Sequence, residues 1–343
     1  MKRSKRAALL SAVLLCCLCA CGTSTETAAR HSVALVVKST NTEFWLSVFA
    51  GAEAAAAEYN LELTVAGPET EEDYEAQNRM IDSAVNAGAE ALVFSAIDYE
   101  KNAAAIDAAA QAGVQIVSID SGVDSDFVST YIGTDNYSAG RMAALAALES
   151  VEGPLSVGIV NYDEGTANGQ EREQGVRDAL EESGRARIGA SVTTLVEAGR
   201  AQSDAAALLS QNPDINVLVA FNEPTSVGAA RAVEELGLEE EVFLVGFDSN
   251  VVTIEGLQTG SVDALIVQNP YAMGYLGVES AYKLLSGQGG TLPPTVDTST
   301  QIVYQSNMFS VDSQKALFAF EQRSTERYAQ KQGPHFLHLV VFK

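Results

Sequence analysis

The sequence predicts an α/β protein made of two doubly wound parallel-sheet lobes. From residue 32 onward, short β-branched runs alternate with alanine-rich stretches of helical period, which is the pattern of repeated βαβ units. The alternation starts again near residue 155, so that two such units follow one another. The 343 residues, 47% of them hydrophobic, are enough to bury two cores.

The first series of elements alternates strands with helices. Its strands are expected at residues 33–37, 61–65, 91–94, 115–119 and 128–132. Between Phe44 and Tyr59, apolar residues recur at helical spacing, so one stripe of this helix faces a core. Asp73 lies in a capping-box pattern that opens the next helix, and Gly88 closes it. A further helix ends at Gly113, because glycine accommodates the left-handed cap conformation.

The second series repeats this order. Its strands are expected at residues 155–160, 188–193, 217–220, 243–245 and 264–267, and its helices at 170–182, 201–210 and 226–236. Two successive doubly wound units imply two sheets with a groove between them. Ligands of such sheets bind beyond the carboxyl ends of the strands. The residues that follow each strand are therefore the candidates for a site.

Polar residues follow most of the expected strands. After the first strand, a polar turn begins at Lys38 and reaches the adjacent aromatic residues Phe44 and Trp45. The later strand ends contribute Ser95, Asp120, Asp135, Asn136, Asn161, Arg172, Asn222, Glu223, Asp248 and Gln268. Carboxylates, amides and a guanidinium match the donors and acceptors of vicinal hydroxyl groups, and an aromatic ring can stack on the C–H face of a sugar ring. This set favours a polyhydroxyl ligand.

The two adjacent aromatic residues cannot both face one core from a helix. One of Phe44 and Trp45 is therefore expected in the core and the other against a ligand, and burial of both is the alternative.

The N-terminus predicts secretion and lipid attachment. A basic head with an apolar run to residue 20 is typical of a signal peptide, too short for a membrane-spanning helix. It ends in a motif that resembles a bacterial lipobox, so Cys21 is expected to be lipidated; cleavage elsewhere without a lipid is the alternative. All four cysteines lie in this segment, so if Cys21 carries the lipid the mature protein has no free thiol, and disulfides and thiolate metal sites are excluded.

The charge argues against nucleic acid as a partner. The net charge is −24, and removal of the four basic leader residues leaves 17 Lys and Arg against 45 Asp and Glu, or −28. Such a surface repels phosphate backbones.

At these residues the sequence resembles the periplasmic binding proteins of the ribose and galactose type, which have the type 1 fold, over about residues 33–321. The motifs that support the resemblance are 33–37 with Asn41 and Phe44-Trp45, Gly133-Thr134-Asp135-Asn136, Glu171-Arg172-Glu173 before Gly175, Ala220-Phe221-Asn222-Glu223, Val245-Gly246-Phe247-Asp248 and Val267-Gln268-Asn269-Pro270.

The resemblance implies a site and a mode of action. Asn41, Asp120, Arg172, Asn222, Asp248 and Gln268 would hydrogen-bond sugar hydroxyls, and Phe44 and Trp45 would flank the ring. The ribose-binding branch has an arginine where this chain has Ser121, and a phenylalanine where it has Val196 or Glu197, so the sugar need not be ribose. The protein would close at its hinge around a monosaccharide and present this closed form to the permease subunits of an ABC importer. It would act as a lipid-anchored monomer and would need no cofactor, metal or catalytic step.

The family fold implies discontinuous domains. The expected division is a signal peptide at 1–20, a lipidated tether at 21–31, an N-terminal lobe at 32–134 and 269–296, a C-terminal lobe at 135–268 and 297–322, and a tail at 323–343 that does not resemble the family. Three interpretations of the tail are possible: an appended helix, an extension without fixed structure, or a reading-frame artefact.

The sequence disfavours two of three alternative functions. An enzyme is disfavoured because the sequence has no dinucleotide, Walker or nucleophile-elbow motif and no metal-ligand cluster. A repressor with this sensor fold is disfavoured because a signal peptide takes the place of the DNA-binding head. A sensor that docks on a chemoreceptor or kinase is not separated from an importer by the sequence.

Overall fold

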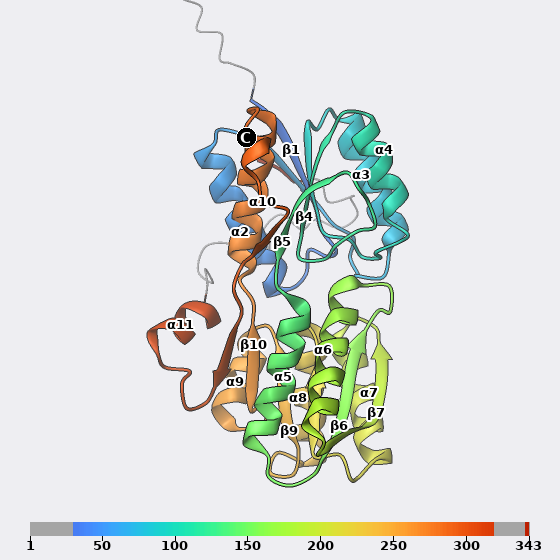
Figure 1. Ribbon diagram of the computed structural model, residues 1–343, viewed down its shortest axis with the longest axis vertical. Coiled ribbons are helices and arrows are strands. Elements are labelled where there is room, and N and C mark those ends of the chain that lie inside the picture. The colour runs from blue at the N-terminus through green and yellow to red at the C-terminus, as the bar shows by residue number, and fades with distance from the viewer. Residues whose placement is uncertain (1–29, 319–339, 343) are drawn as a thin grey trace, which may run out of the picture. The chain divides into compact units, whose positions relative to one another are not determined.

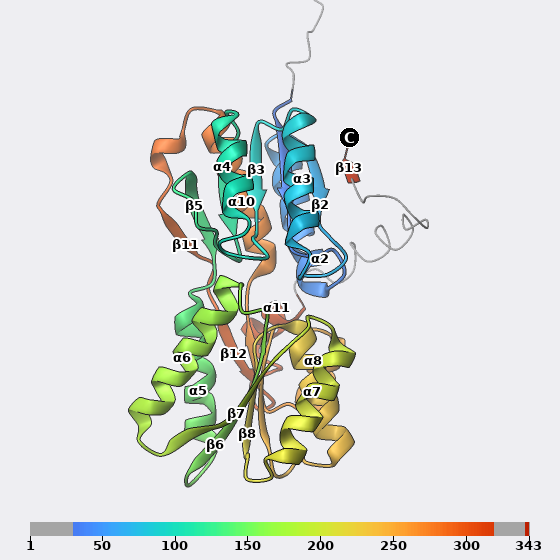
Figure 2. The same cartoon turned by 90° about the vertical axis from the view of Figure 1, so that its right-hand side faces the viewer.

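The computed structural model describes residues 30–318 and 340–342. The expectations for the signal peptide, for Cys21 and for most of the tail lie outside these residues. The described chain forms two parallel-sheet lobes, which confirms the predicted fold class (Figures 1 and 2). We call the lobe built on the first sheet the N-lobe and the lobe built on the second sheet the C-lobe.

The N-lobe sheet has the strand order β11-β5-β4-β3-β1-β2-β13. Its strands are β1 (Ser32–Val36), β2 (Glu62–Ala66), β3 (Ala91–Phe94), β4 (Gln115–Ile119), β5 (Val128–Gly133), β11 (Thr295–Asp297) and β13 (Val340–Phe342). Strand β1 pairs in parallel with both β2 and β3, so the strand order of this doubly wound sheet reverses at β1. Strand β13 pairs antiparallel with β2 and forms the edge of the sheet, so part of the tail returns to the N-lobe.

Helices cover both faces of the N-lobe sheet. They are α2 (Glu43–Glu58), α3 (Tyr74–Asn86), α4 (Ala103–Gln111) and α10 (Pro270–Leu285), with a short 3-10 turn at Gly289–Thr291. Residues of β1 alternate between two cores, because successive side chains of a strand point to opposite faces. Leu35 packs with α2 and α10, whereas Val36 packs with α3 and α4.

The C-lobe sheet has the order β12-β10-β9-β8-β6-β7. Its strands are β6 (Leu155–Tyr162), β7 (Ala186–Thr194), β8 (Val217–Ala220), β9 (Phe243–Phe247), β10 (Ala264–Val267) and β12 (Gln301–Tyr304). Helices α5 (Asn136–Ser150) and α6 (Ala167–Ser183) pack on one face; α7 (Ala198–Gln211), α8 (Glu223–Leu236) and α9 (Val251–Thr259) pack on the other, and α11 (Val311–Leu317) follows β12. Only β12 runs antiparallel to its neighbour in this sheet.

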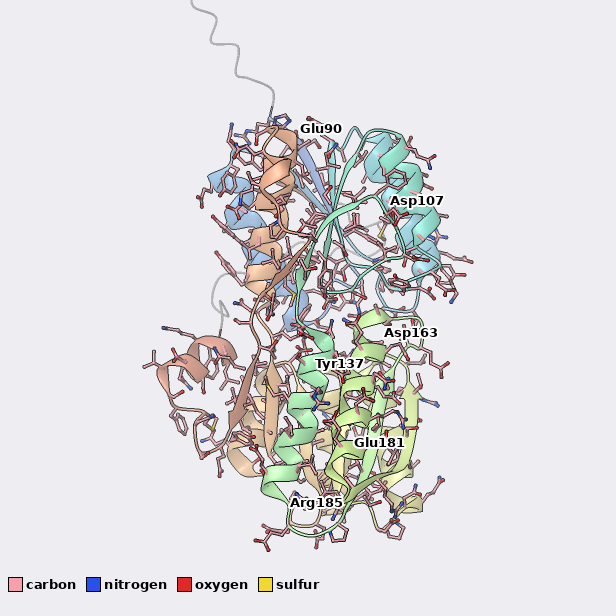
Figure 3. The ribbon with its side chains drawn as sticks, viewed as in Figure 1. Glu90, Asp107, Tyr137, Asp163, Glu181 and Arg185 are labelled. Carbon is pink, nitrogen blue, oxygen red and sulfur yellow. The ribbon has the colours of Figure 1, made fainter. Side chains whose placement is uncertain are left out.

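The chain passes between the lobes at three places. These lie between β5 and α5, between β10 and α10, and between β11 and β12. Exposed acidic side chains such as Glu90 and Glu181 lie on the outer surface of both lobes, in keeping with the negative net charge (Figure 3). The three crossings place the carboxyl ends of the parallel strands of both sheets at the junction of the lobes.

Helices α2 and α10 approach closely because glycines face their contact. A Cβ atom at Gly274 would collide with the carbonyl oxygen of Val48, and one at Gly51 would collide with that of Tyr271. The close contact fixes α2, whose N-terminus lies at the candidate site.

Candidate functional site

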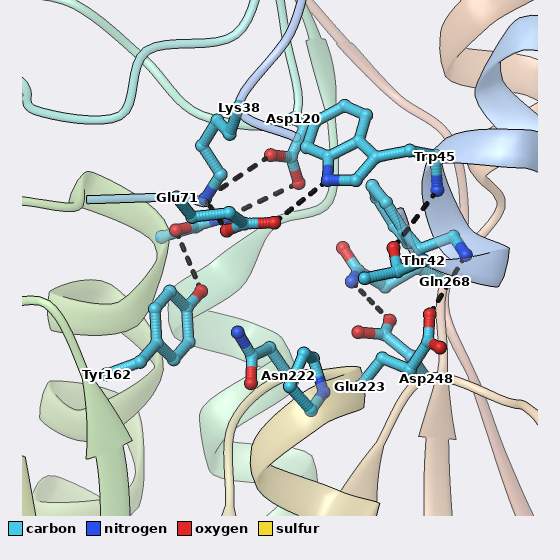
Figure 4. A pocket seen from close by; sticks show the side chains of 13 residues that line it. Lys38, Thr42, Trp45, Glu71, Asp120, Tyr162, Asn222, Glu223, Asp248 and Gln268 are labelled. Carbon is cyan, nitrogen blue, oxygen red and sulfur yellow. Dashed lines mark hydrogen bonds and ion pairs between the residues drawn. The ribbon is translucent and has the colours of Figure 1, made fainter. Parts of the chain in front are cut away.

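A pocket lies between the lobes at the carboxyl ends of the parallel strands (Figure 4). Its lining consists of Lys38, Thr42, Phe44, Trp45, Glu71, Asp120, Tyr162, Asn168, Asn222, Glu223, Pro224, Asp248 and Gln268. The space between these residues is about 280 Å³. This volume includes space that is open to solvent, so it is an upper limit on the room that the closed lobes leave for a ligand.

The structure brings six of the eight predicted ligand-binding residues into this lining. They are Phe44, Trp45, Asp120, Asn222, Asp248 and Gln268. Asn41 does not line the pocket: its side chain is exposed and donates to the carbonyl oxygen of Glu69. Arg172 is buried behind the lining and contacts the pocket through Gln268. Ser121 and Val196, which stand at positions where this chain differs from the ribose-binding branch, are also outside the lining.

Both aspartates at the strand ends have a left-handed backbone. Asp120 follows β4 with φ 57°, and Asp248 follows β9 with φ 65°. Aspartate tolerates this conformation better than most residues, because its short side chain can bond locally. The same sharp turn in both lobes directs one carboxylate from each sheet into the pocket.

The aromatic pair is buried, as the alternative interpretation held, and it also lines the pocket. Phe44 and Trp45 are 9% and 1% exposed and belong to the N-lobe core. Their rings meet edge to face, with centroids 5.0 Å apart, an arrangement that aromatic pairs prefer. The Trp45 Nε1 atom donates to Glu71 Oε1 over 2.8 Å, so the indole is held in one orientation.

A buried lysine joins the carboxylates of the N-lobe. The Lys38 Nζ atom lies 3.3 Å from Glu71 Oε2 and 3.8 Å from Asp120 Oδ2, and it faces the ring of Tyr162 at 5.4 Å. Burial alone would lower the pKa of Lys38, but the charge of Glu71, with smaller contributions from Tyr162 and Asp120, outweighs burial and raises this pKa above its ordinary value. Lys38 is therefore a permanent cation.

A second chain of hydrogen bonds supports the C-lobe wall from behind. The Gln268 amide donates to Asp248 Oδ1 over 2.6 Å and accepts from Arg172 and Thr134 at 2.8 Å each. Arg172 also donates to Asn136 Oδ1 and to the carbonyl oxygen of Phe221. This network ties α6 to the ends of β8 and β10 and to the first interlobe crossing.

Hydrogen bonds across the junction show that the lobes are closed. Glu223, in the first turn of α8, accepts from the backbone N–H of Phe44 over 3.0 Å and of Glu43 over 3.4 Å. Asn168 donates to Asp120 over 3.3 Å, and the backbone N–H of Val196 donates to Glu72 over 2.6 Å. The carboxylate of Glu223 thus caps α2 of the opposite lobe, where a helix N-terminus favours negative charge.

Two carboxyl groups of the C-lobe wall have raised pKa values. Burial raises the pKa of Glu223 to about 7, against the hydrogen bond from Phe44, and the charge of Asp248 adds to this. Burial likewise raises the pKa of Asp248 to about 6, although Arg172 and Gln268 act to lower it.

Several lining residues were absent from the sequence-based prediction of ligand contacts. They are Lys38, Thr42, Glu71, Tyr162, Asn168, Glu223 and Pro224. Lys38 and Glu223 follow strands and appear in the motifs already considered, and Tyr162 is the last residue of β6. The rule that sites lie at strand ends could have identified these three.

The comparisons with known proteins agree with this geometry. The family described as periplasmic binding protein domain matches residues 33–289. A D-ribose/D-allose-binding protein of Pseudomonas aeruginosa is 30% identical over 304 residues, which cover 84% of this chain and 94% of that protein. A ribose import binding protein of Escherichia coli is 27% identical over 289 residues, covering 84% of this chain and 95% of that protein.

Solved structures give the same result. A carbohydrate transporter solute-binding protein from Agrobacterium radiobacter in complex with D-arabinose superposes with a TM-score of 0.81 at 27% identity, over 84% of this chain and 99% of that one. An ABC transporter solute-binding protein from Agrobacterium vitis with bound D-fucose has a TM-score of 0.80 at 28% identity, over 83% and 99%. Within the described part of the chain, every helix is too short or too polar to cross a membrane.

Proposed function

Because this chain belongs to the periplasmic binding protein family, we propose that it captures a monosaccharide between its lobes and delivers it to an ABC importer. The resemblance to the ribose-type binding proteins is confirmed by these relatives, among which are sugar-binding proteins of import systems. A binding protein of this kind needs no catalytic step.

The observation that supports this proposal most is the composition of the pocket. Two aromatic residues, Phe44 and Trp45, offer apolar surface for the C–H groups of a sugar ring. Carboxylates and amides from the strand ends of both sheets surround them, so hydroxyl groups on opposite sides of one ligand would contact opposite lobes. A ligand that contacts both lobes favours the closed form, which membrane subunits can distinguish from the open form.

The lipid anchor and the partner are part of the proposal. The lipobox-like motif supports attachment of a lipid at Cys21, which would hold the protein at the outer face of the cell membrane. We propose that it acts there as a monomer and that its partners are the permease subunits of the importer. Incorporation of labelled palmitate into the wild type, and its loss in Cys21→Ala, would support the anchor. Equal labelling of both proteins would exclude this cysteine.

Thermal unfolding in the presence of single monosaccharides tests the binding function. A ligand present at about 100 times its dissociation constant stabilises the folded state by about 2.7 kcal/mol. We expect at least one pentose or hexose to raise the midpoint of unfolding in a concentration-dependent way. If no monosaccharide shifts the midpoint at millimolar concentration, the proposed function is wrong.

A further inference from the structure

The two walls of the pocket differ in how their negative charge is balanced. Glu71 and Asp120, on the N-lobe wall, share the ammonium group of Lys38. Glu223 and Asp248, on the C-lobe wall, have no Lys, Arg or His nitrogen within 4.0 Å among residues 30–318 and 340–342. The lining therefore contains four carboxyl groups and a single cation.

Arg172 does not complete the balance of the C-lobe wall. It lies behind Gln268 and donates hydrogen bonds to Asn136, to the Phe221 carbonyl group and to Gln268. Its charge acts on Asp248 from a distance, and the largest influences on the pKa of Glu223 are burial, the backbone N–H groups of Phe44 and Glu43, and the negative charges of Asp248 and Glu43. A buried carboxylate without a counter-charge is unfavourable, because burial removes its hydration.

A ligand-directed donor lies on the same wall. The Asn222 side chain is more than nine-tenths buried, and its Oδ1 atom caps α8 by accepting from Thr225. Its Nδ2 atom has no hydrogen-bond partner in the described part of the chain, and Figure 4 shows this amide directed into the pocket. Because this N–H₂ group faces the pocket and has no partner among the described residues, it can donate to an acceptor on the ligand, such as a hydroxyl oxygen.

We propose that the ligand is an amino-substituted monosaccharide whose ammonium group lies between Glu223 and Asp248 while a neighbouring hydroxyl group accepts from Asn222. This inference rests on the proposed function, since it specifies the class of sugar that the same pocket takes. The ammonium group supplies the missing counter-charge, and the aromatic rings and the Asn222 amide retain the carbohydrate part. A metal ion is a poorer occupant, because the described residues contain no group of three or more side chains able to hold one.

The expected binding has a characteristic pH dependence. Glu43 of α2 and Asp248 act on Glu223 as negative charges; Arg172 of α6 and Asp120 at the end of β4 act on Asp248. Affinity for an amino sugar should fall below about pH 7, as first Glu223 and then Asp248 take up protons. It should fall again above about pH 8, where a free amine loses its charge. A neutral sugar has no amine, so its affinity should not fall above about pH 8 for this reason.

Matched ligand pairs test the inference. The pairs are D-glucose with D-glucosamine, D-galactose with D-galactosamine, D-mannose with D-mannosamine and D-ribose with 2-amino-2-deoxy-D-ribose, titrated calorimetrically at pH 7 into the full chain. We expect the tightest ligand to be an amine that binds at least tenfold more tightly than its neutral counterpart. If the neutral member of the best pair binds as well or better, the amine preference is wrong and the sugar-binding function stands. If neither member of any pair binds, both are wrong.

A variant locates the preference on the C-lobe wall. Glu223→Gln keeps the shape of the side chain but removes its charge, so the ratio of amine to neutral affinity should fall at least tenfold. Glu72→Gln is the matched control, because Glu72 also accepts a backbone N–H of the opposite lobe but does not line the pocket. This control should leave the ratio unchanged. An unchanged ratio in Glu223→Gln would exclude Glu223 as the partner of the amine.

Discussion

Replacement of Arg172 by methionine should destabilise the protein and weaken its ligand binding together. Arg172 is 1% exposed, and its guanidinium group packs over the ring of Phe247 at 4.7 Å. Methionine replaces the packed hydrocarbon part but leaves Asn136 Oδ1 and the Phe221 carbonyl oxygen without this donor. Gln268 Oε1 keeps its bond from Thr134.

The magnitude follows from the two acceptors that lose a charged donor. Hydrogen bonds to charged groups contribute about 1.5–3 kcal/mol each, so the loss of two should lower the free energy of unfolding by about 3–6 kcal/mol. Affinity should fall as well, because Gln268 loses the group that orients it against Asp248. Urea unfolding without ligand and calorimetric titration with it measure the two effects.

Arg177→Met provides the control on the same helix. Arg177 is half-exposed and pairs with Glu173 one turn away, and such surface pairs contribute at most about 1 kcal/mol. The reasoning would be refuted if Arg172→Met lost no more stability than Arg177→Met. It would be refuted in part if Arg172→Met were unstable but bound its ligand as the wild type does, since the network would then not position the wall.

Three further predictions concern the indole, the helix contact and pH. Trp45→Phe keeps a ring but removes the donor to Glu71, so affinity should fall by about 1–2 kcal/mol in calorimetry; unchanged affinity would show that this bond does not orient the wall. Gly274→Ala should cost about 2 kcal/mol or more of unfolding free energy through its collision with α2, whereas Gly290→Ala, which faces open space, should cost little; equal urea midpoints would contradict the close approach. Because burial raises the native pKa of Glu223 to about 7, the native state binds more protons than the unfolded state between about pH 5 and 7. Without ligand, the free energy of unfolding should therefore fall with rising pH, by about 3 kcal/mol more in the wild type than in Glu223→Gln. Parallel pH profiles of the two proteins would contradict this.

The two-lobed fold could be predicted because its signals are local. The strands of both sheets are short apolar runs, and glycines such as Gly237 end the helices with the left-handed conformation that a helix cap requires. The edges of the sheets had no such signal. Strand β12 is half-buried and antiparallel, and β13 joins a sheet more than 270 residues away from its neighbour β2, so neither placement follows from a local pattern.

The sequence predicts the site residues that directly follow a strand. It does not predict the residues that a turn or a contact between the lobes brings to the pocket. Asp120 and Asp248 follow directly from the ends of β4 and β9. In the turn after β1, the sequence does not specify which side chains point inward, and the structure turns Lys38 and Thr42 to the pocket while Asn41 points outward. The strand-end rule could have placed Glu223 at the pocket, but its bond to α2 joins two residues that are 179 positions apart in the chain, and no local pattern encodes that contact.

Arg172 illustrates the same limit. The resemblance to a family identifies Arg172 as a site residue, but it does not say whether the side chain lines the pocket or lies behind the lining. In this structure the side chain lies behind Gln268, so its influence on a ligand passes through that amide.

The fluorescence of Trp45 provides the most direct test of ligand capture between the lobes. Trp45 is the only tryptophan of the chain, and it lines the pocket. Titration with monosaccharides and amino sugars should give a saturable change in emission with a stoichiometry of one ligand per chain. If no sugar changes the emission, or if only a nucleotide does so, the account of this pocket as a sugar site is contradicted.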